Sequence, residues 1–353
     1  MKIAIVAFGN IKFSPYIFPY VDVLKKQGAE IELIYPNRMG IKEEFADGIL
    51  REIKWDNTKN KALNFVSFKS QVSKILKKGK YDFVIVLTTF PAVLLAGVLK
   101  SRYRGKYLVD VRDFTHEDSS VYYYFEKKVL KNASLRVISS PGFKNFLPEE
   151  DYCICHNVSA EYKSGARHFA KKDSGKIVIG YVGSIAYAAN CKKIIDLVKK
   201  DDRFCFCFYG NEKGSMPVTS YVKECNCERI KCFGEYSPSQ KSEIIEGVDM
   251  MFNVYGNRKP LVRYALSNKL YDSMYFKKPL LVSPDTDMQR QGGDFAYAIE
   301  PEKVHNLDDL YKWYMNIHSK EYDEYANTYI DNVFKSNKEF EKRLIDVLNN
   351  QGK

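Results

Sequence analysis

KIAIVAFG at residues 2–9 and KIVIGYVGS at residues 176–184 are the two stretches that decide the fold. Each is a short apolar run that leads into a glycine, as expected of a strand buried on both faces of a parallel sheet. Behind each run, strand patterns alternate with helical patterns, and the alternation restarts at residue 176. The sequence therefore predicts an α/β protein with two doubly wound, Rossmann-like domains in tandem.

The alternation covers most of the chain. Predicted strands lie at 2–9, 30–36, 81–89, 106–113, 134–140, 152–158, 176–184, 203–210, 228–236, 249–256 and 279–285. Predicted helices lie at 14–28, 59–80, 91–105, 121–133, 191–200, 237–247 and 268–278, followed by a helical tail from Asn306. Ser237-Pro238-Ser239-Gln240 has the form of a capping box, which favours a helix start at this point.

Length and a polar interruption set the domain boundaries. The 353 residues exceed what one hydrophobic core usually supports, and SAEYKSGARHFAKKDSG at 159–175 is the best linker candidate. We expect domains at 1–165 and 166–330, with residues 331–353 forming a C-terminal helix. The opening MKIAIVAFGN lacks the features of a signal peptide, and no apolar run reaches the ~18 residues that cross a bilayer, so we expect a cytoplasmic protein.

The segment at 59–80 is strongly basic, with seven lysines and no acidic residue. Residues 1–165 carry 26 Lys and Arg against 18 Asp and Glu, so +8 of the net charge of +11 lies there. The apolar residues at helical spacing in this segment are Phe65, Phe68, Val72, Ile75 and Leu76. Two interpretations stay open. The helix binds an anionic membrane surface on the inner face of the cell membrane, or its stripe packs on its own sheet and its lysines are solvated.

Other ligand classes find little support. Zinc sites need wider cysteine spacing than the pairs Cys153/Cys155, Cys205/Cys207 and Cys225/Cys227, so we expect structural thiols and no metal. Nucleic acid binding is not expected, because no recognition motif is present. The sequence also lacks G-x-G-x-x-G and the P-loop motif.

Ligands of doubly wound sheets bind beyond the carboxyl ends of the strands, which two tandem sheets would place face to face across a cleft. Gly9 follows the first strand of the first domain, although a structural turn also explains it. Gly183 and Ser184 follow the first strand of the second domain. These three residues are candidate ligand contacts.

The stretch YGNRKPLVRYALSNKLYDSMYFKKPLLVS at 255–283 is the most informative one. Ser267 can cap a helix whose first turn holds Asn268, and Asp272 follows one turn later. The cations of this stretch that precede or open the helix are Arg258, Lys259, Arg263 and Lys269. A helix N-terminus among cations suits a diphosphate, and a carboxylate beyond it can bind both hydroxyls of a ribose. A capped helix behind a solvated basic loop is the alternative.

A titratable cluster at 110–118 follows a predicted strand of the first domain. Its Asp113 and His116 could position an acceptor hydroxyl, or act as general base if the reaction inverts. The alternative is an ion-pair network in which Arg112 neutralises Asp110 or Asp113.

SNKLYDSMYFKKPLLVS resembles the P-N-K-L-x-E-x-x-x-x-G-K-P-hydrophobic signature of family 4 glycosyltransferases, which are retaining enzymes of the GT-B fold. YLVDVRDFTHED is similar to the D-x-R-D segment of members that assemble bacterial polysaccharides, and YVGSI, FYGN and IKCFGEYS follow the family's order of elements. The resemblance spans nearly the whole chain. It implies an acceptor domain at 1–165, a nucleotide-sugar domain at 166–330 and a C-terminal helix that returns to the first domain.

The resemblance further implies metal-independent hexosyl transfer, with retention, from a nucleotide-diphosphate sugar to a glycan or lipid-linked saccharide. The nucleotide sugar is a co-substrate and no cofactor is expected. Asp272 would bind the ribose, although the family usually has the longer Glu. Residues 183–189 lack the Arg and Lys that often follow the first strand of the second domain, so the cations at 258–269 would neutralise the diphosphate. The alternatives are a non-catalytic donor-binding or scaffolding subunit, and a nucleotide-sugar epimerase of the same fold.

Overall fold

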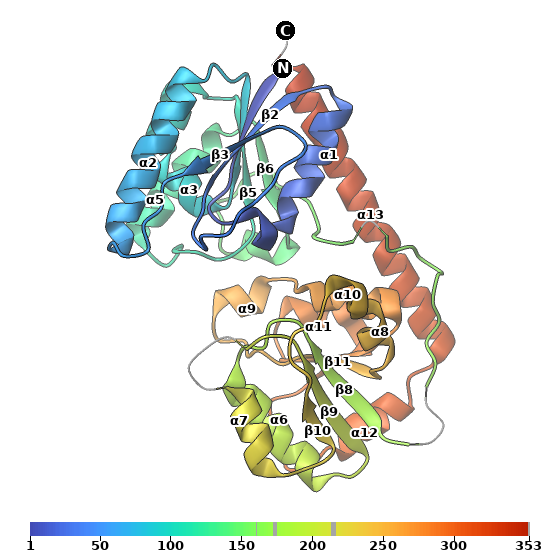
Figure 1. The fold of residues 1–353 in the computed structure, drawn as a ribbon. Coiled ribbons are helices and arrows are strands. Elements are labelled where there is room, and N and C mark those ends of the chain that lie inside the picture. Colours follow the sequence, from blue (N-terminus) through green and yellow to red (C-terminus); the bar gives the residue numbers. More distant parts are fainter. Residues whose placement is uncertain (160, 172–174, 213–216, 352–353) are drawn as a thin grey trace. The chain divides into compact units, whose positions relative to one another are not determined.

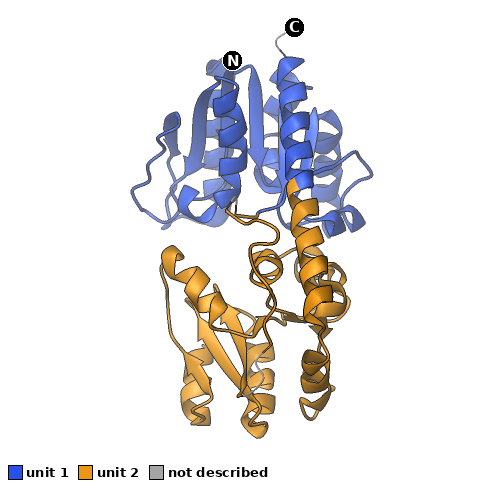
Figure 2. Ribbon diagram, turned by 90° about the vertical axis from the view of Figure 1, so that its right-hand side faces the viewer, with its two compact units in different colours: residues 1–157, 335–353 blue, residues 158–334 orange. Residues whose placement is uncertain are grey.

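Figure 2 shows the two compact units of the structure, a computed structural model that describes residues 1–159, 161–171, 175–212 and 217–351. Unit 1 comprises residues 1–157 and 335–353, and unit 2 comprises residues 158–334. The first boundary lies eight residues before the one expected from the polar linker, between 157 and 158 instead of 165 and 166. The reason is that Tyr162 and Phe169, within this linker, are buried in the core of unit 2.

Unit 1 is built on a seven-stranded sheet with the order β3-β2-β1-β4-β5-β6-β7, and all neighbouring strands are parallel. Its strands are β1 (Lys2–Val6), β2 (Glu30–Pro36), β3 (Ile49–Ile53), β4 (Phe83–Leu87), β5 (Tyr107–Val111), β6 (Leu135–Ile138) and β7 (Cys153–Ile154). Its helices are α1 (Phe18–Lys26), α2 (Lys61–Lys78), α3 (Thr89–Leu94), α4 (Ala96–Arg102) and α5 (Ser120–Asn132), with short 3-10 turns η1 (Ile11–Phe13), η2 (Pro15–Ile17) and η3 (Pro141–Asn145). The strand order reverses between β1 and β4, which is where such sheets bind ligands.

Unit 2 is built on a six-stranded parallel sheet with the order β10-β9-β8-β11-β12-β13. Its strands are β8 (Ile177–Val182), β9 (Phe204–Tyr209), β10 (Ile230–Cys232), β11 (Met250–Asn253), β12 (Leu280–Val282) and β13 (Ala296–Ala298). Its helices are α6 (Ala188–Lys200), α7 (Val218–Cys225), α8 (Lys241–Glu246), α9 (Pro260–Tyr264), α10 (Asn268–Phe276), α11 (Asp287–Gly292) and α12 (Asp308–Met315), with 3-10 turns η4 (Pro238–Gln240) and η5 (Gly293–Phe295). Here the strand order reverses between β8 and β11 (Figure 1).

The doubly wound α/β fold predicted from the sequence is therefore confirmed for both units. The predicted helix at 91–105 is two helices, because the chain breaks at Leu95 between α3 and α4. Strand β3 was not predicted: its residues ILREI are mostly exposed at the sheet edge and carry no apolar run. The capping box is present, since Ser237 and Gln240 bond each other's backbone at the start of η4.

The long helix α13 (Ser319–Asn349) belongs to both units, because the boundary falls within it at 334/335. Within each unit, its buried apolar residues recur three or four positions apart and so form a stripe. In the core of unit 2 these are Tyr322, Ala326, Ile330 and Val333, and in the core of unit 1 they are Phe340, Leu344 and Leu348.

Helix α2 packs its apolar stripe against its own unit. Phe68, Val72 and Leu76 are buried, and Phe65 is half-buried, whereas all the lysines at 59–80 are exposed. Of the two interpretations of this helix, the stripe itself supports packing on the sheet. None of the helices in the described ranges is long and apolar enough to cross a lipid bilayer.

Helix α10 ends at Phe276 and is followed by Lys277, at the position that holds glycine in the family signature. Lys277 adopts the left-handed conformation (φ 56°) that makes glycine favourable at a helix C-terminus. Its buried ammonium donates to Met274 O at 2.9 Å and to Asn327 Oδ1 of α13 at 2.8 Å. The side chain thus fastens α10 to α13, which gives the lysine a structural role at a position that otherwise favours glycine.

Candidate functional site

The carboxyl end of the sheet in unit 2 carries two glycines whose backbones touch. Gly183 follows β8 with φ +120°, and Gly210 follows β9 with φ +135°. A Cβ atom on Gly210 would lie 2.0 Å from the carbonyl oxygen of Gly183, so only glycine fits there. Ser184 is exposed next to this contact, with Oγ 3.3 Å from Asn211 Oδ1. The ends of β8 and β9 therefore present a glycine-lined backbone surface beside the point where the strand order reverses, with Gly183 half-buried and Gly210 buried.

Lys269 brings a cation to this surface. Ser267 caps α10 by accepting a hydrogen bond from Lys269 N at 3.3 Å, and Asn268 is exposed in the first turn. The Lys269 side chain is buried, and its Nζ lies 3.4 Å from where a Cβ of Gly183 would be. Burial lowers the pKa of Lys269, whereas the charge of Asp272 opposes that shift. The structure thus supplies from α10 the cation that residues 183–189 lack.

Asp272 lies one helical turn further along α10 and is only 4% exposed. Its Oδ1 accepts hydrogen bonds from Tyr162 Oη at 2.5 Å and from Lys241 Nζ at 2.7 Å. Sequence reasoning missed both partners. They lie 110 and 31 residues away in the chain, and no motif connects them to Asp272. Because Oδ1 already accepts two hydrogen bonds, a ribose hydroxyl at this site would donate to Oδ2.

A neighbouring pocket of about 470 Å³ in unit 2 holds two of the other predicted cations, Arg258 and Lys259. Tyr187 and Tyr255 line it and stack on each other with ring centroids 4.4 Å apart. The ring of Tyr255 also lies 5.6 Å from Lys269 Nζ, which connects the pocket to the glycine surface.

Arg263 lines neither place. Its guanidinium is exposed, 5.8 Å from the ring centroid of Tyr264. The four predicted cations are therefore not gathered at one point. Lys269 lies beside Gly183, Arg258 and Lys259 line the pocket, and Arg263 stands apart.

In unit 1, the strand-end residues Asp110 and Arg112 form a buried ion pair of 2.7 Å. Arg112 also donates to the carbonyl oxygen of Cys155 at 3.0 Å. The ion-pair interpretation therefore accounts for Asp110. Asp113 differs, because its side chain is exposed. The surrounding atoms nevertheless remove part of the hydration of the Asp113 carboxylate, which raises its pKa to about 6. The positive charge of Arg112 opposes this shift, and the negative charge of Glu117 adds to it.

His116 and Phe8, the neighbour of Gly9, both contact the ring of Phe90. The ring of His116 is exposed and packs on Phe90 with centroids 5.7 Å apart, and Phe90 contacts Phe8, the neighbour of Gly9, at 5.2 Å. Within the part of the chain that the structure describes, no atom outside the two chain neighbours of Gly9 lies within 4 Å of where its Cβ would be. The aromatic cluster around them comprises Phe8, Trp55, Phe65, Phe68, Phe90 and Tyr122. Of the candidate residues in unit 1, His116 therefore packs directly on this aromatic cluster, and Gly9 follows one of its members, Phe8.

A buried carboxyl pair that the sequence did not reveal lies beside His116. Glu126 of α5 is 1% exposed, and neither of its carboxyl oxygens has a hydrogen-bond partner among the described residues. Burial and the neighbouring Glu117 raise the pKa of Glu126 to about 9. Burial also raises the pKa of Glu117, so the pair retains a proton at neutral pH.

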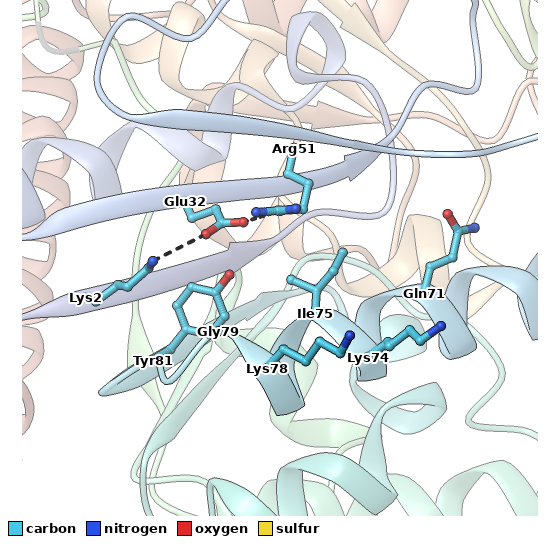
Figure 3. A pocket seen from close by; sticks show the side chains of 9 residues that line it. All are labelled: Lys2, Glu32, Arg51, Gln71, Lys74, Ile75, Lys78, Gly79 and Tyr81. Carbon is cyan, nitrogen blue, oxygen red and sulfur yellow. Dashed lines mark hydrogen bonds and ion pairs between the residues drawn. The ribbon is translucent and has the colours of Figure 1, made fainter.

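A separate pocket of about 430 Å³ lies in unit 1 near Lys2 and Tyr81, where strands β1 and β4 begin. Figure 3 shows Glu32 between Lys2 and Arg51, to which it is paired, with Lys74 and Lys78 nearby. This is the edge opposite to the carboxyl ends of the strands, and none of the candidate site residues lines the pocket. We therefore do not assign the pocket to the candidate site.

Residues 2–140 match the family model described as glycosyl transferase 4-like. By sequence, no curated protein matches the chain. The fold is similar to a sucrose-phosphate synthase from Thermosynechococcus elongatus, with TM-score 0.71 and 11% identity over 98% of this chain and 99% of that chain. It is also similar to a glycosyltransferase from Rickettsia africae, with TM-score 0.69 and 16% identity over 100% and 98%. Anabaena HepE, solved in complex with UDP, gives TM-score 0.67 and 13% identity over 98% and 100%.

These matches confirm the resemblance inferred from the sequence motifs. Residues 2–140 match the glycosyl transferase 4-like model, and the fold of the whole chain is the GT-B fold, with two Rossmann-like units.

Proposed function

We propose that this protein transfers a hexose, with retention and without a metal ion, from a nucleotide-diphosphate sugar to a glycan or lipid-linked saccharide. The observation that carries the proposal is the position of Lys269 beside Gly183, with Asp272 one turn further along α10. A cation at a glycine-lined strand end suits a diphosphate, and a carboxylate just beyond it suits a ribose.

In this proposal the diphosphate binds at the N-terminus of α10, where Ser267, Asn268 and Lys269 meet Gly183 and Ser184. Its negative charge increases as the bond to the sugar breaks, so a buried ammonium stabilises the transition state more than the bound donor. Arg258 and Lys259 in the adjoining pocket supply further positive charge. Because HepE was solved with UDP, UDP-sugars are the first donors to test.

Unit 1 binds the acceptor in this proposal. Gly9 leaves room next to the aromatic cluster, and His116 packs on the same cluster. Asp113, with its pKa near 6, is ionised at neutral pH and can accept a hydrogen bond from an acceptor hydroxyl.

A panel of UDP-, GDP- and ADP-sugars with free and lipid-linked saccharides, followed by mass spectrometry of the products, tests the proposal. Transfer to the acceptor supports it. An isomerised donor without transfer indicates the epimerase. Donor binding without any turnover indicates the non-catalytic subunit, which the absence of Arg and Lys at 183–189 favours. No donor binding at all contradicts the assignment of the site.

We further propose that unit 1 associates with the inner face of the cell membrane, where a lipid-linked acceptor would lie. Phe65 and Phe68 are not available for insertion, because the aromatic cluster holds them. Leu63 and Val66 of α2 are instead 59% and 66% exposed among the lysines. Helices α2 and α5 both pack on α3 and α4, and α5 exposes its own apolar residues, Val121, Tyr124 and Phe125. Exposed apolar side chains among lysines are typical of membrane-binding surfaces.

Liposome sedimentation tests this association. We expect binding to vesicles with anionic lipid at low salt, weaker binding at high salt, and loss of binding in Val66→Glu and Val121→Glu. Met39→Glu is the matched control, because Met39 is 61% exposed but lies on neither helix. Binding that does not depend on lipid charge or on salt would contradict the proposal. An equal loss of binding in all three variants would contradict it as well.

A further inference from the structure

The candidate ribose ligand Asp272 is not a free carboxylate. Two side chains converge on the same oxygen, with Tyr162 Oη and Lys241 Nζ both bonded to Oδ1. No described residue donates a hydrogen bond to Oδ2. One oxygen of the carboxylate is therefore held from two sides, and the other is left for a ligand.

Tyr162 is itself held firmly in place. Its ring stacks on Tyr275 with centroids 4.0 Å apart and an interplanar angle of 3°, and its edge meets Phe276 at 5.9 Å. Arg167 covers the rings of Tyr275 and Phe276 and pairs with Glu246 of α8. The Tyr162 hydroxyl thus reaches Asp272 from a packed aromatic layer, four residues after Val158, the first residue of unit 2.

Lys241 approaches from the first turn of α8, which packs against α10. Its side chain is 33% exposed, whereas that of Asp272 is 5% exposed. An ammonium group has three N–H donors, and one of them serves Asp272. The remaining donors are available to a ligand that arrives from solvent.

We infer that Tyr162 and Lys241 are positioning residues for the donor ribose, because they hold Oδ1 of Asp272 and leave Oδ2 to accept a ribose hydroxyl. The inference rests on the proposed function, in which Asp272 binds the donor. The second hydroxyl of the ribose then bonds to Lys241. A carboxylate fixed before binding loses less conformational freedom when the ligand arrives, which strengthens binding to the ribose alone.

The test is calorimetry with UDP and with 2′,3′-dideoxy-UDP, extended to the GDP and ADP pairs. Tyr162→Phe removes the hydroxyl and keeps the ring stack. We expect this variant to bind the ribonucleotide about fivefold more weakly and the dideoxy analogue as before. Lys241→Met should lower ribonucleotide affinity about tenfold, and Lys241→Arg should restore part of it.

Tyr221→Phe is the matched control, since Tyr221 Oη makes a similar bond of 2.7 Å to Asp196, away from α10. Thermal unfolding of every variant checks that the fold is kept. A ribose preference unchanged in Tyr162→Phe and Lys241→Met overturns the inference and leaves the proposed function standing, as do equal losses for both nucleotides. A wild-type protein that binds no nucleoside diphosphate overturns both.

Discussion

Unit 1 and unit 2 share one strand order around their first strands, yet their ligand-binding edges differ in chemistry. In unit 2 the edge carries Gly183 with the ammonium of Lys269 beside it. In unit 1 the corresponding edge carries Gly9 next to Phe8 of the aromatic cluster, on which His116 also packs, and Asp113 follows β5. The same fold thus carries different side chains at its strand ends in the two units, and the proposed function assigns each set its own ligand.

The difference between the two strand ends lies in the charges of their side chains. A diphosphate carries negative charge that a buried cation can stabilise, whereas a saccharide hydroxyl is neutral and needs a hydrogen-bond acceptor. Lys269 is a cation that loses part of its hydration, and Asp113 is an acid whose pKa lies close to neutral. These charges are the reason why, in the proposed function, unit 2 binds the donor and unit 1 binds the acceptor.

Removing the positive charge of Lys269 in unit 2 should have the largest effect on activity. We expect Lys269→Met to lower kcat by about 100-fold or more, because the leaving diphosphate loses its nearest positive charge. Lys312→Met, at a lysine that is 73% exposed on α12, should leave kcat unchanged. Initial rates with saturating donor measure both. A normal kcat in Lys269→Met would contradict this assignment and would indicate that Arg258 and Lys259 bind the diphosphate instead.

The second effect concerns donor binding. Asp272→Asn should weaken binding of the nucleoside diphosphate by about 1.5–3 kcal/mol, or roughly 10- to 100-fold, since a charge-assisted bond to the ribose is lost. Calorimetry of the variant against Asp309→Asn, whose carboxylate is 85% exposed on α12, measures it. Equal affinity in the two variants would remove Asp272 from the donor site.

Substitutions in unit 1 should lower activity toward the acceptor and leave the affinity for the donor unchanged. Asp113→Asn and His116→Ala should lower kcat/KM for the acceptor about tenfold and leave nucleotide binding unchanged. Ionised Asp113 accepts a stronger hydrogen bond from the acceptor hydroxyl than protonated Asp113 does, so wild-type kcat/KM should rise as the pH passes through the Asp113 pKa of about 6. Asp113→Asn should lose this rise, and the exposed Glu44→Gln should keep it. A weaker nucleotide affinity in either unit 1 variant would break the division between the units.

The smallest effect is on stability. Unfolded Glu126 ionises near its ordinary pKa of 4.5, whereas folded Glu126 stays protonated up to about pH 9. Rising pH in this window therefore favours the unfolded state. Glu126→Gln cannot ionise, so it should unfold a few degrees higher than wild type at pH 8 and no higher at pH 4. Glu44→Gln should match wild type in both thermal scans. A Glu126→Gln protein without this pH dependence would mean that the carboxyl pair does not retain a proton.

Much of the fold follows from local sequence. Apolar runs such as KIAIVAFG and EIELIYP form buried parallel strands, because such strands are covered on both faces. Ser267 caps α10 and Ser237 opens η4 as predicted, since capping depends on residues a few positions apart. Strand β3 escaped prediction because its pairing with β2, rather than its own pattern, makes it a strand.

The sequence by itself determined the α/β alternation, the presence of two Rossmann-like units and the helix that begins after Ser267. All three follow from patterns of residues that lie close together in the chain. Only the tertiary structure decided that Lys269 lies beside Gly183, that Arg263 stands apart from Arg258, and that α2 buries Phe68 and exposes Val66. It alone joined Tyr162 to Asp272 across 110 residues. Such contacts depend on how strands and helices pack, and no local pattern of residues encodes a distance between segments that are far apart in the chain.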